Sequence, residues 1–83
     1  MLVHKVKPVY PAAAKAAHIE GTVVLHAIIA KDGTVEHLEY VSGPVELKDS
    51  AIEAVSKWRY KPMLLNNQAV EVDTEISVRF GKH

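Results

Sequence analysis

The strongest constraint on the fold is a strict alternation of apolar and polar residues from Val70 to Phe80. Successive side chains of a β-strand point to opposite faces, so this pattern predicts a strand that is buried on one face and solvated on the other. Because most of the polar positions are charged, the pattern also favours an edge of the sheet. The inward set is Val70, Val72, Thr74, Ile76, Val78 and Phe80, and the outward set is Glu71, Asp73, Glu75, Ser77 and Arg79.

A β-hairpin is expected earlier in the chain, over residues 21–43. Asp32 and Gly33 separate two β-rich segments, which predicts a two-residue type I′ turn with Lys31 paired to Thr34. This register fixes the cross-strand pairs on both faces. Leu25 faces Tyr40 and Ala27 faces Leu38 on one side, and Val24 faces Val41, His26 faces Glu39 and Ile28 faces His37 on the other.

Two helices are expected, one before the hairpin and one after it in the sequence. Pro11 suits the first helical position, the alanines after it are strong helix formers, and Gly21 is expected to stop the helix. The second helix is expected from Asp49 to Trp58, capped by its first residue or by a capping box of Ser50 and Glu53. Its apolar stripe consists of Leu47, Ala51, Ile52, Val55 and Trp58.

The expected order of elements is therefore helix, strand, strand, helix, strand. The first hairpin strand is apolar on both faces, which favours a central position. A right-handed crossover through the second helix places the last strand beside it, antiparallel to it. We predict an α+β fold with a three-stranded antiparallel-type sheet of order 2-1-3 and two helices packed on one face. One domain is expected over residues 1–83, with an ordered core of about residues 8–80.

The segment WRYKP, residues 58–62, contains the single tryptophan and one of three tyrosines. In the architectural interpretation, Trp58 and Tyr60 cover the core at the end of the second helix, while Arg59 and Lys61 complement the helix dipole. The alternative is a contact for an incoming peptide or another partner. The architectural interpretation is preferred, and it gives a structural core of Leu25, Ala27, Ile52, Val55, Trp58 and Tyr60.

Composition argues against several classes of protein. Ten basic residues balance ten acidic ones, so no net charge attracts the chain to nucleic acid or anionic lipid. Cysteine is absent, which removes disulfides and thiolate metal sites. No serine has a His–Asp arrangement nearby and no glycine-rich phosphate loop is present, so neither catalysis nor a cofactor is expected. The longest apolar stretch, residues 23–30, is too short to span a bilayer.

The outer face of the predicted hairpin raises two further hypotheses. His26, His37 and Glu39 share this face, but they lack a fourth ligand and supporting groups for zinc, so surface histidines and no metal site are expected. The same face carries an apolar patch that favours homodimerisation, including strand exchange. The residues of this patch are Val24, Ile28, Ala30, Val35 and Val41.

Five segments match one family in order and spacing: YP at residues 10–11, IEGTV at 19–23, KDGTV at 31–35, AIEAVSKWRYKP at 51–62 and the alternating last strand. Together they resemble the C-terminal domain of TonB over about residues 8–80. The resemblance implies a periplasmic domain of a protein that is anchored in the bacterial inner membrane and driven by the ExbB–ExbD motor. The anchor and the Pro-rich spacer are not in this chain, so binding without force transmission is expected of it.

The resemblance also implies a binding site. Domains of this family bind the TonB box, a short extended peptide at the N-terminus of an outer-membrane transporter, as a strand added beside their last strand. Lys7 departs from the enteric members, which have glutamine at this position, and this puts the polar pairing with the box in question. The alternative use of the same fold is a structural or homodimerisation domain of a larger envelope protein. The implied edge is Val70, Glu71, Val72, Asp73, Thr74, Glu75, Ile76, Ser77, Val78, Arg79 and Phe80, flanked by Lys7, Pro8, Val9, Tyr10 and Pro11.

Overall fold

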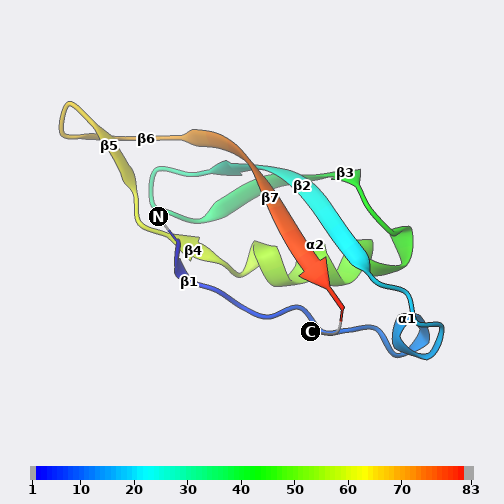
Figure 1. Ribbon diagram of the computed structural model, residues 1–83. Coiled ribbons are helices and arrows are strands. Elements are labelled where there is room, and N and C mark those ends of the chain that lie inside the picture. The colour runs from blue at the N-terminus through cyan, green and yellow to red at the C-terminus, as the bar shows by residue number, and fades with distance from the viewer. Residues whose placement is uncertain (1, 82–83) are drawn as a thin grey trace.

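Three antiparallel strands form the central sheet of the computed structural model, which describes residues 2–81 (Figure 1). β2 (Gly21–Ile29) lies in the centre, between β3 (Val35–Ser42) and β7 (Val72–Phe80). The central position follows from the apolar residues that β2 carries on both faces. The predicted α+β fold is confirmed, and the strand order β3-β2-β7 agrees with the order expected from the sequence.

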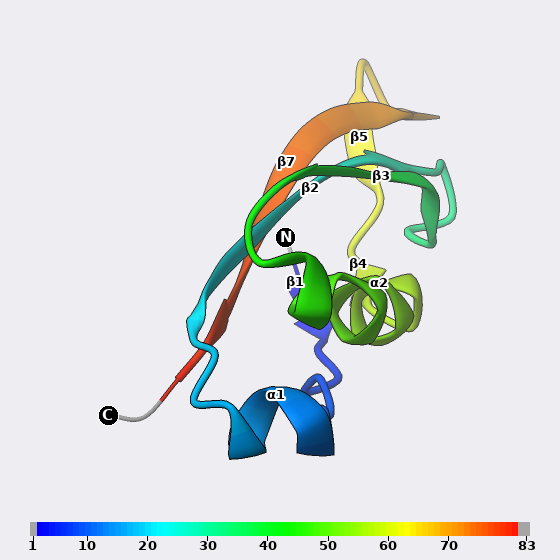
Figure 2. The same ribbon diagram turned by 90° about the vertical axis from the view of Figure 1, so that its right-hand side faces the viewer.

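Both helices cover the same face of the sheet (Figure 2). α1 spans Ala12–Ala16, and α2 spans Lys48–Ser56 directly after a 3-10 turn, η1, at Val45–Leu47. Their apolar residues pack on the inward side chains of β2 and β7. The buried cluster consists of Ala14, Val23, Leu25, Ala27, Leu47, Ala51, Val55, Trp58, Ile76, Val78 and Phe80, with Ile52 and Tyr60 half-buried against it.

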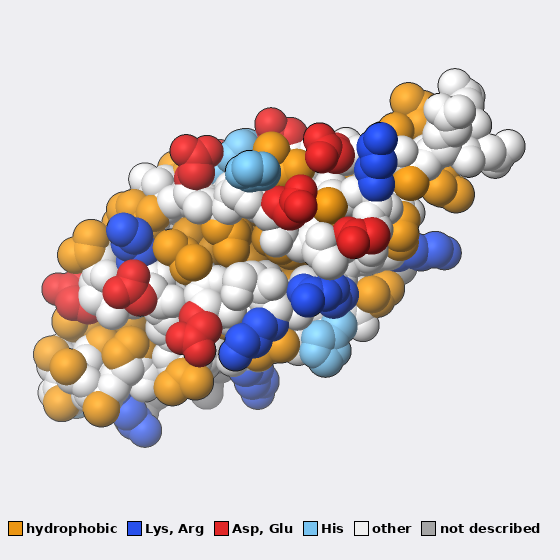
Figure 3. Space-filling view, turned by 180° about the vertical axis from the view of Figure 1, so that it is seen from behind, with side chains coloured by type: hydrophobic (Ala, Val, Ile, Leu, Met, Phe, Trp, Pro, Cys, Tyr) orange, Lys and Arg blue, Asp and Glu red, His pale blue; other side chains and the backbone are white. Residues whose placement is uncertain are grey.

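Four short strands that the sequence did not predict lie outside this sheet. β1 (Leu2–His4) pairs with β4 (Arg59–Tyr60), and β5 (Met63–Leu65) pairs with β6 (Gln68–Val70). The β5–β6 hairpin projects from the body of the molecule (Figures 1 and 3). The described residues therefore form an elongated shape with principal extents of 49 × 21 × 19 Å.

The predicted strand from Val70 to Phe80 is divided in the structure. β6 ends at Val70, Glu71 lies between the two strands, and β7 begins at Val72. From Val72 onward the expected alternation holds, because every second residue is buried or half-buried. The inward and outward faces of β7 are those that the sequence predicts.

The end of α1 differs from the prediction. His18, not Gly21, reverses the chain, with a φ of 58°. The N–H of His18 donates to the carbonyl of Lys15 (3.2 Å), and the N–H of Ile19 donates to the carbonyl of Ala14 (2.9 Å). This pattern is a Schellman motif, which satisfies the last carbonyls of the helix without glycine.

The limits of α2 also differ from the prediction. The helix starts one residue before Asp49 and ends at Ser56, and no side chain caps its first turn. The expected capping box is wrong, because the Ser50 hydroxyl donates to the carbonyl of Val9 instead. At the other end, Arg59 Nη1 donates to the carbonyls of Ser56 (3.3 Å) and Trp58 (2.8 Å). Arg59 therefore satisfies the helix terminus, in agreement with the architectural interpretation.

The predicted hairpin register holds in the middle of the ladder and fails at both ends. Leu25 pairs with Tyr40, and His26 pairs with Glu39, as expected. Two irregularities shift the outer pairs by one residue, which is the effect of β-bulges. Val24 pairs with Ser42 rather than Val41, and Ile28 pairs with Glu36 rather than His37.

The bulge near the turn changes which side chains face outward. His37 has a φ of 51°, and Val35 pairs with Ile29. Since Ile29 is buried, Val35 faces the core and is half-buried against it. The sequence placed Val35 in the outer apolar patch, and this assignment is wrong.

The turn itself is not type I′. The N–H of Ala30 donates to the carbonyl of Thr34 (2.8 Å), so three residues, not two, form the loop. Only Gly33 among these three has a positive φ, at 91°, whereas a type I′ turn requires two such residues. The Asp32 carboxylate accepts bonds from the Thr34 hydroxyl (2.7 Å) and N–H (3.0 Å), which lower the pKa of Asp32.

Candidate functional site

Within residues 2–81, β3 and β7 are both edge strands of the central sheet, and the candidate site lies along the edge of β7. β7 pairs with β2 along its whole length, from Val72 opposite Ile29 to Phe80 opposite Gly21. Within residues 2–81, no strand pairs with the other side of β7. Backbone N–H and C=O groups on that side are therefore available to another extended chain.

The segment of residues 5–11, which we call the strap, lies along one part of this edge. The indole Nε1 of Trp58 donates to the carbonyl of Val6 (2.8 Å), and Lys5 Nζ lies 5.5 Å from the centre of the Trp58 ring. The Ser50 hydroxyl holds the carbonyl of Val9. These contacts fasten an otherwise irregular segment to α2 and to Trp58, two residues after its end.

Tyr10 joins the strap to the end of β7. Its hydroxyl donates to the carbonyl of Ile19, just after α1. Its ring meets Phe80 edge-on, with ring centres 5.5 Å apart and planes at 84°. An edge-to-face pair of this geometry is favourable, so the two rings set the spacing between strap and strand.

A groove of about 440 Å³ lies between the strap and the C-terminal half of β7. The structure therefore brings part of the predicted strap set next to part of the predicted edge. Val9 and Pro11 do not line the groove, and the side chain of Val9 is exposed. The predicted residues that do line it are Lys7, Pro8, Tyr10, Ser77, Val78, Arg79 and Phe80.

The N-terminal half of the predicted edge lies away from the strap. Here a hollow of about 190 Å³ lies between β7 and the β4–β5 connection. Val72 and Thr74 line it on the strand side, and Tyr60 and Met63 line it on the other side. One strand edge thus borders two separate hollows, one at each end.

The outer face of the sheet contains a polar cluster around His26. Its Nε2 is hydrogen-bonded to Asp73 on β7, and its Nδ1 lies 3.5 Å from Glu39 on β3. Glu75 pairs with His26 in the β2–β7 register. The bond to Asp73 is the main cause that raises the pKa of His26, and the charges of Asp73 and Glu39 act in the same direction against desolvation.

This cluster predicts a pH-dependent stability. Since folding raises the pKa of His26, its contribution is fully present below the unfolded value of about 6.5 and is lost as the pH rises through the folded pKa. Urea unfolding between about pH 5.5 and 8.5 should show a falling free energy of unfolding, and a flatter profile is expected for His26→Gln. His37→Gln is the matched control, because His37 makes no ion pair among residues 2–81. Equal slopes in all three proteins would contradict the prediction.

The structure separates the other residues that the sequence placed together on this outer face. His37 sits in the bulge and does not join His26, and among residues 2–81 no group of three potential ligands is placed to hold a metal ion. Val41 is 49% exposed, whereas Val24 and Ile28 are half-buried. The outer apolar patch is therefore smaller than the sequence indicates.

Two parts of the site were missed by sequence reasoning. The first is the hydrogen bond from Trp58 to the strap. A tryptophan near the end of a helix does not indicate which carbonyl its indole N–H will bind. The second is the hollow beside Met63, which depends on the β5–β6 hairpin. That hairpin did have a signal: Asn66 and Asn67, with φ of 53° and 67°, form a two-residue turn between two short apolar segments.

A family model described as Gram-negative bacterial TonB protein C-terminal matches residues 6–81. The chain belongs to the TonB C-terminal family. Within the part of the chain that the structure describes, none of the helices combines the length and the apolar character needed to cross a membrane.

Two curated relatives of this TonB C-terminal domain are longer proteins. Protein TonB of Vibrio cholerae serotype O1 (strain ATCC 39315 / El Tor Inaba N16961) is 33% identical over 78 residues, which cover 92% of this chain and 32% of the relative. Protein TonB of Klebsiella pneumoniae is 34% identical over 61 residues, which cover 71% of this chain and 25% of the relative. The chain thus spans a third or less of the length of these relatives.

A solved structure supports the same fold. The solution NMR structure of the Pseudomonas aeruginosa TonB CTD superimposes with a TM-score of 0.73 and 23% sequence identity. The match covers 100% of this chain and 88% of that chain. The arrangement of helices around the sheet is therefore that of a TonB C-terminal domain.

Proposed function

We propose that this chain is the periplasmic peptide-binding module of a TonB-like energy transducer. In this role it is non-enzymatic and binds the TonB box of an outer-membrane transporter by β-augmentation along β7. The single observation that carries the proposal is the unpaired edge of β7, in a chain that belongs to the TonB C-terminal family. An exposed edge of this kind is a template for an added strand, which gains backbone hydrogen bonds and places alternate side chains in pockets.

The geometry suggests moderate affinity. Four or five added backbone hydrogen bonds, at about 0.5–1.5 kcal/mol net each, must offset the entropy of association. The balance suggests a dissociation constant on the order of micromolar. Reversible binding in this range suits a coupling device that must release its transporter after each cycle.

The wider assignment follows the family. The parent protein is proposed to be anchored in the inner membrane and driven by ExbB–ExbD through a region outside this chain. Since Val70 already pairs with Met63 of β5, the peptide is proposed to contact residues 72–80 along the edge and the strap at Lys7, Pro8 and Tyr10. Support for the strap assignment comes from the groove that these residues share with the end of β7.

The proposal predicts which amides respond to a peptide. Addition of a TonB-box peptide should shift the ¹⁵N–¹H signals of residues 72–80 and of the strap, because new hydrogen bonds form along that edge. The signals of β3, on the opposite edge of the sheet, should move least. The control is the same peptide with proline at alternate positions, which cannot donate those bonds. Unmoved signals at residues 72–80 with the unmodified peptide would refute the proposal.

Homodimerisation is the second candidate function. It is supported by the exposed side chain of Val41 and by the same free edge of β7, which a second copy could occupy. Sedimentation at micromolar concentrations separates the two functions, because a dimer formed through β7 competes with the peptide. A dimer that persists at saturating peptide would place the dimer contact elsewhere on the molecule.

A further inference from the structure

The two hollows beside β7 each lie next to two inward-facing residues of the strand. The first lies next to Val72 and Thr74, and the second next to Val78 and Phe80. Each residue of the first pair stands six positions before its counterpart in the second. At about 3.3 Å per residue, six positions correspond to about 20 Å along the strand.

The hollow at the start of β7 is mainly apolar. Ile29, Tyr60, Met63 and Val72 contribute to its walls, and Lys61 lies at the same hollow. Met63 is half exposed, at 50%, although it is a large apolar residue. An apolar side chain placed here would cover Met63 and the neighbouring wall, which is favourable in proportion to the area removed from water.

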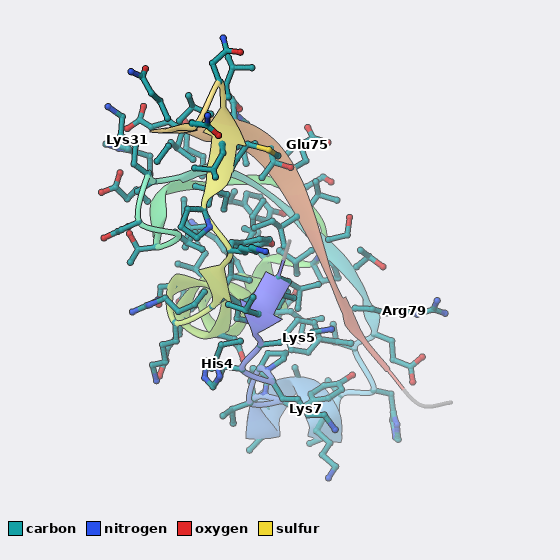
Figure 4. All side chains as sticks on the ribbon, turned by 90° about the vertical axis from the view of Figure 1, so that its left-hand side faces the viewer. His4, Lys5, Lys7, Lys31, Glu75 and Arg79 are labelled. Atoms are coloured by element: carbon teal, nitrogen blue, oxygen red, sulfur yellow. The ribbon has the colours of Figure 1, made fainter. Side chains whose placement is uncertain are left out.

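The groove at the end of β7 has a different chemistry. Lys5 and Lys7 line it together with the aromatic rings of Tyr10 and Trp58, and no carboxylate lines it within residues 2–81. Neither lysine makes an ion pair among the described residues. Lys5 and Lys7 lie on the strap side of this groove, whereas Arg79 borders the groove but directs its side chain away from the strap (Figure 4). The strap side of this end is therefore positively charged, whereas on the other side Arg79 lies near Glu20.

The outer face of β7 carries the opposite sign at its start, where Glu71, Asp73 and Glu75 are exposed. Cross-strand neighbours of like charge are unfavourable, and those of opposite charge are favourable. On the outward face, an acidic side chain of an added strand is thus disfavoured at the start of β7. On the inward face, two lysines, Lys5 and Lys7, line the groove at the strap, whereas the mainly apolar hollow has Lys61 alone, so an acidic side chain is favoured more at the strap. An apolar one is favoured at the hollow beside Met63.

We propose that the free edge of β7 recognises two side chains of its peptide at a fixed spacing: an acidic one at Lys5 and Lys7, and an apolar one beside Met63, six residues apart. This inference rests on the proposed function, because both side chains reach the hollows only if the peptide pairs with β7. The even spacing matters, because residues an odd number apart face opposite sides of a strand. The spacing also sets a minimum length of seven residues for the recognised segment.

The test uses capped, otherwise uncharged Thr/Ser peptides that carry one Asp and one Leu. The two residues are six, five or two positions apart, in both sequence orders, and binding is followed by Trp58 fluorescence and by the amide signals of residues 72–80. In one of the two orders, the spacing of six should bind about fivefold to tenfold more tightly than five or two, since only that spacing fills both hollows. No dependence on spacing in either order, with amide shifts still present at residues 72–80, overturns this inference and leaves the proposed function standing. No shift at residues 72–80 with any peptide refutes both.

Variants of the chain assign the acidic contact. With the best peptide, Asp→Asn in the peptide should weaken binding about threefold to tenfold in the native chain and have no effect in the double variant Lys5→Gln/Lys7→Gln. The double variant Lys5→Arg/Lys7→Arg keeps both charges and should restore the preference. Lys31→Gln is the matched control, because Lys31 lies in the β2–β3 turn and lines neither hollow. A preference for Asp over Asn that survives Lys5→Gln/Lys7→Gln contradicts the assignment. In the native chain, raised salt should reduce this preference, because it screens the charges.

Discussion

Replacing Trp58 with alanine should lower the free energy of unfolding by about 3–5 kcal/mol, which is enough to unfold a marginally stable domain of this size. Trp58 is 5% exposed and belongs to the buried cluster between α2 and the sheet. Alanine leaves a large cavity at that point and also removes the donor for the carbonyl of Val6. Urea unfolding followed by far-UV circular dichroism measures the loss, and a loss below about 1 kcal/mol would contradict the burial of this ring.

Trp58→Phe separates the two contributions. Phenylalanine keeps much of the packing but leaves the carbonyl of Val6 without its indole partner, so a smaller loss of about 1–3 kcal/mol is expected. The strap should also exchange its amide protons faster in Trp58→Phe, because one of its fastenings is gone. Unchanged exchange throughout the strap would show that Ser50 and Tyr10 hold it without Trp58.

The WRYKP segment shows what the sequence could predict. Trp58 continues the apolar stripe of the predicted helix, so its position over the core follows from helical periodicity, although α2 ends at Ser56 and Tyr60 lies in β4. The alternating last strand, with Val72 to Phe80 in β7, follows in the same way from the period of two. These patterns are strong because one face of each element must be buried, and a shift by one residue would expose it.

The ends of the hairpin could not be predicted in the same way. The sequence favours the pair of Asp32 and Gly33 in a two-residue turn, but the loop has three residues, and a bulge at His37 compensates for the change. Both arrangements keep the central pairs, Leu25 with Tyr40 and His26 with Glu39. The choice between them depends on contacts from distant segments, which local preferences do not contain.

The candidate site depends even more on distant contacts. The edge of β7 follows from strand order and charge, but the groove needs the strap, and the strap is held by Trp58, Ser50 and Tyr10 through their side chains. The contacts of Trp58 and Ser50 join segments 52 and 41 residues apart, and the ring of Tyr10 meets Phe80 at the other end of the chain. Likewise, Asp73 reaches His26 only through the β2–β7 register, which no local pattern in the sequence determines.

The three-residue turn requires glycine at position 33. Gly33→Ala should therefore lower the free energy of unfolding by about 3–5 kcal/mol. Gly33 is buried and has a φ of 91°, and a Cβ atom there would lie 1.9 Å from the carbonyl oxygen of Tyr60. The carbonyl of Gly33 also accepts a bond from the Tyr60 N–H (2.8 Å). Alanine must therefore push the β2–β3 turn away from β4 or force one of the two backbones out of place.

Gly81→Ala is the matched control for that variant. Gly81 also has a positive φ, at 152°, but an added Cβ would meet nothing nearer than Glu20 Oε1 at 3.5 Å. Urea unfolding should therefore show a much smaller loss of the free energy of unfolding for Gly81→Ala, and equal losses in the two variants would show that steric exclusion by Tyr60 is not the cause.

The displacement of Tyr60 that Gly33→Ala causes should also reach the binding edge, because Tyr60 lines the apolar hollow beside Met63. Gly33→Ala should thus weaken the preference for leucine in the spaced peptides and leave the preference for aspartate at the strap unchanged.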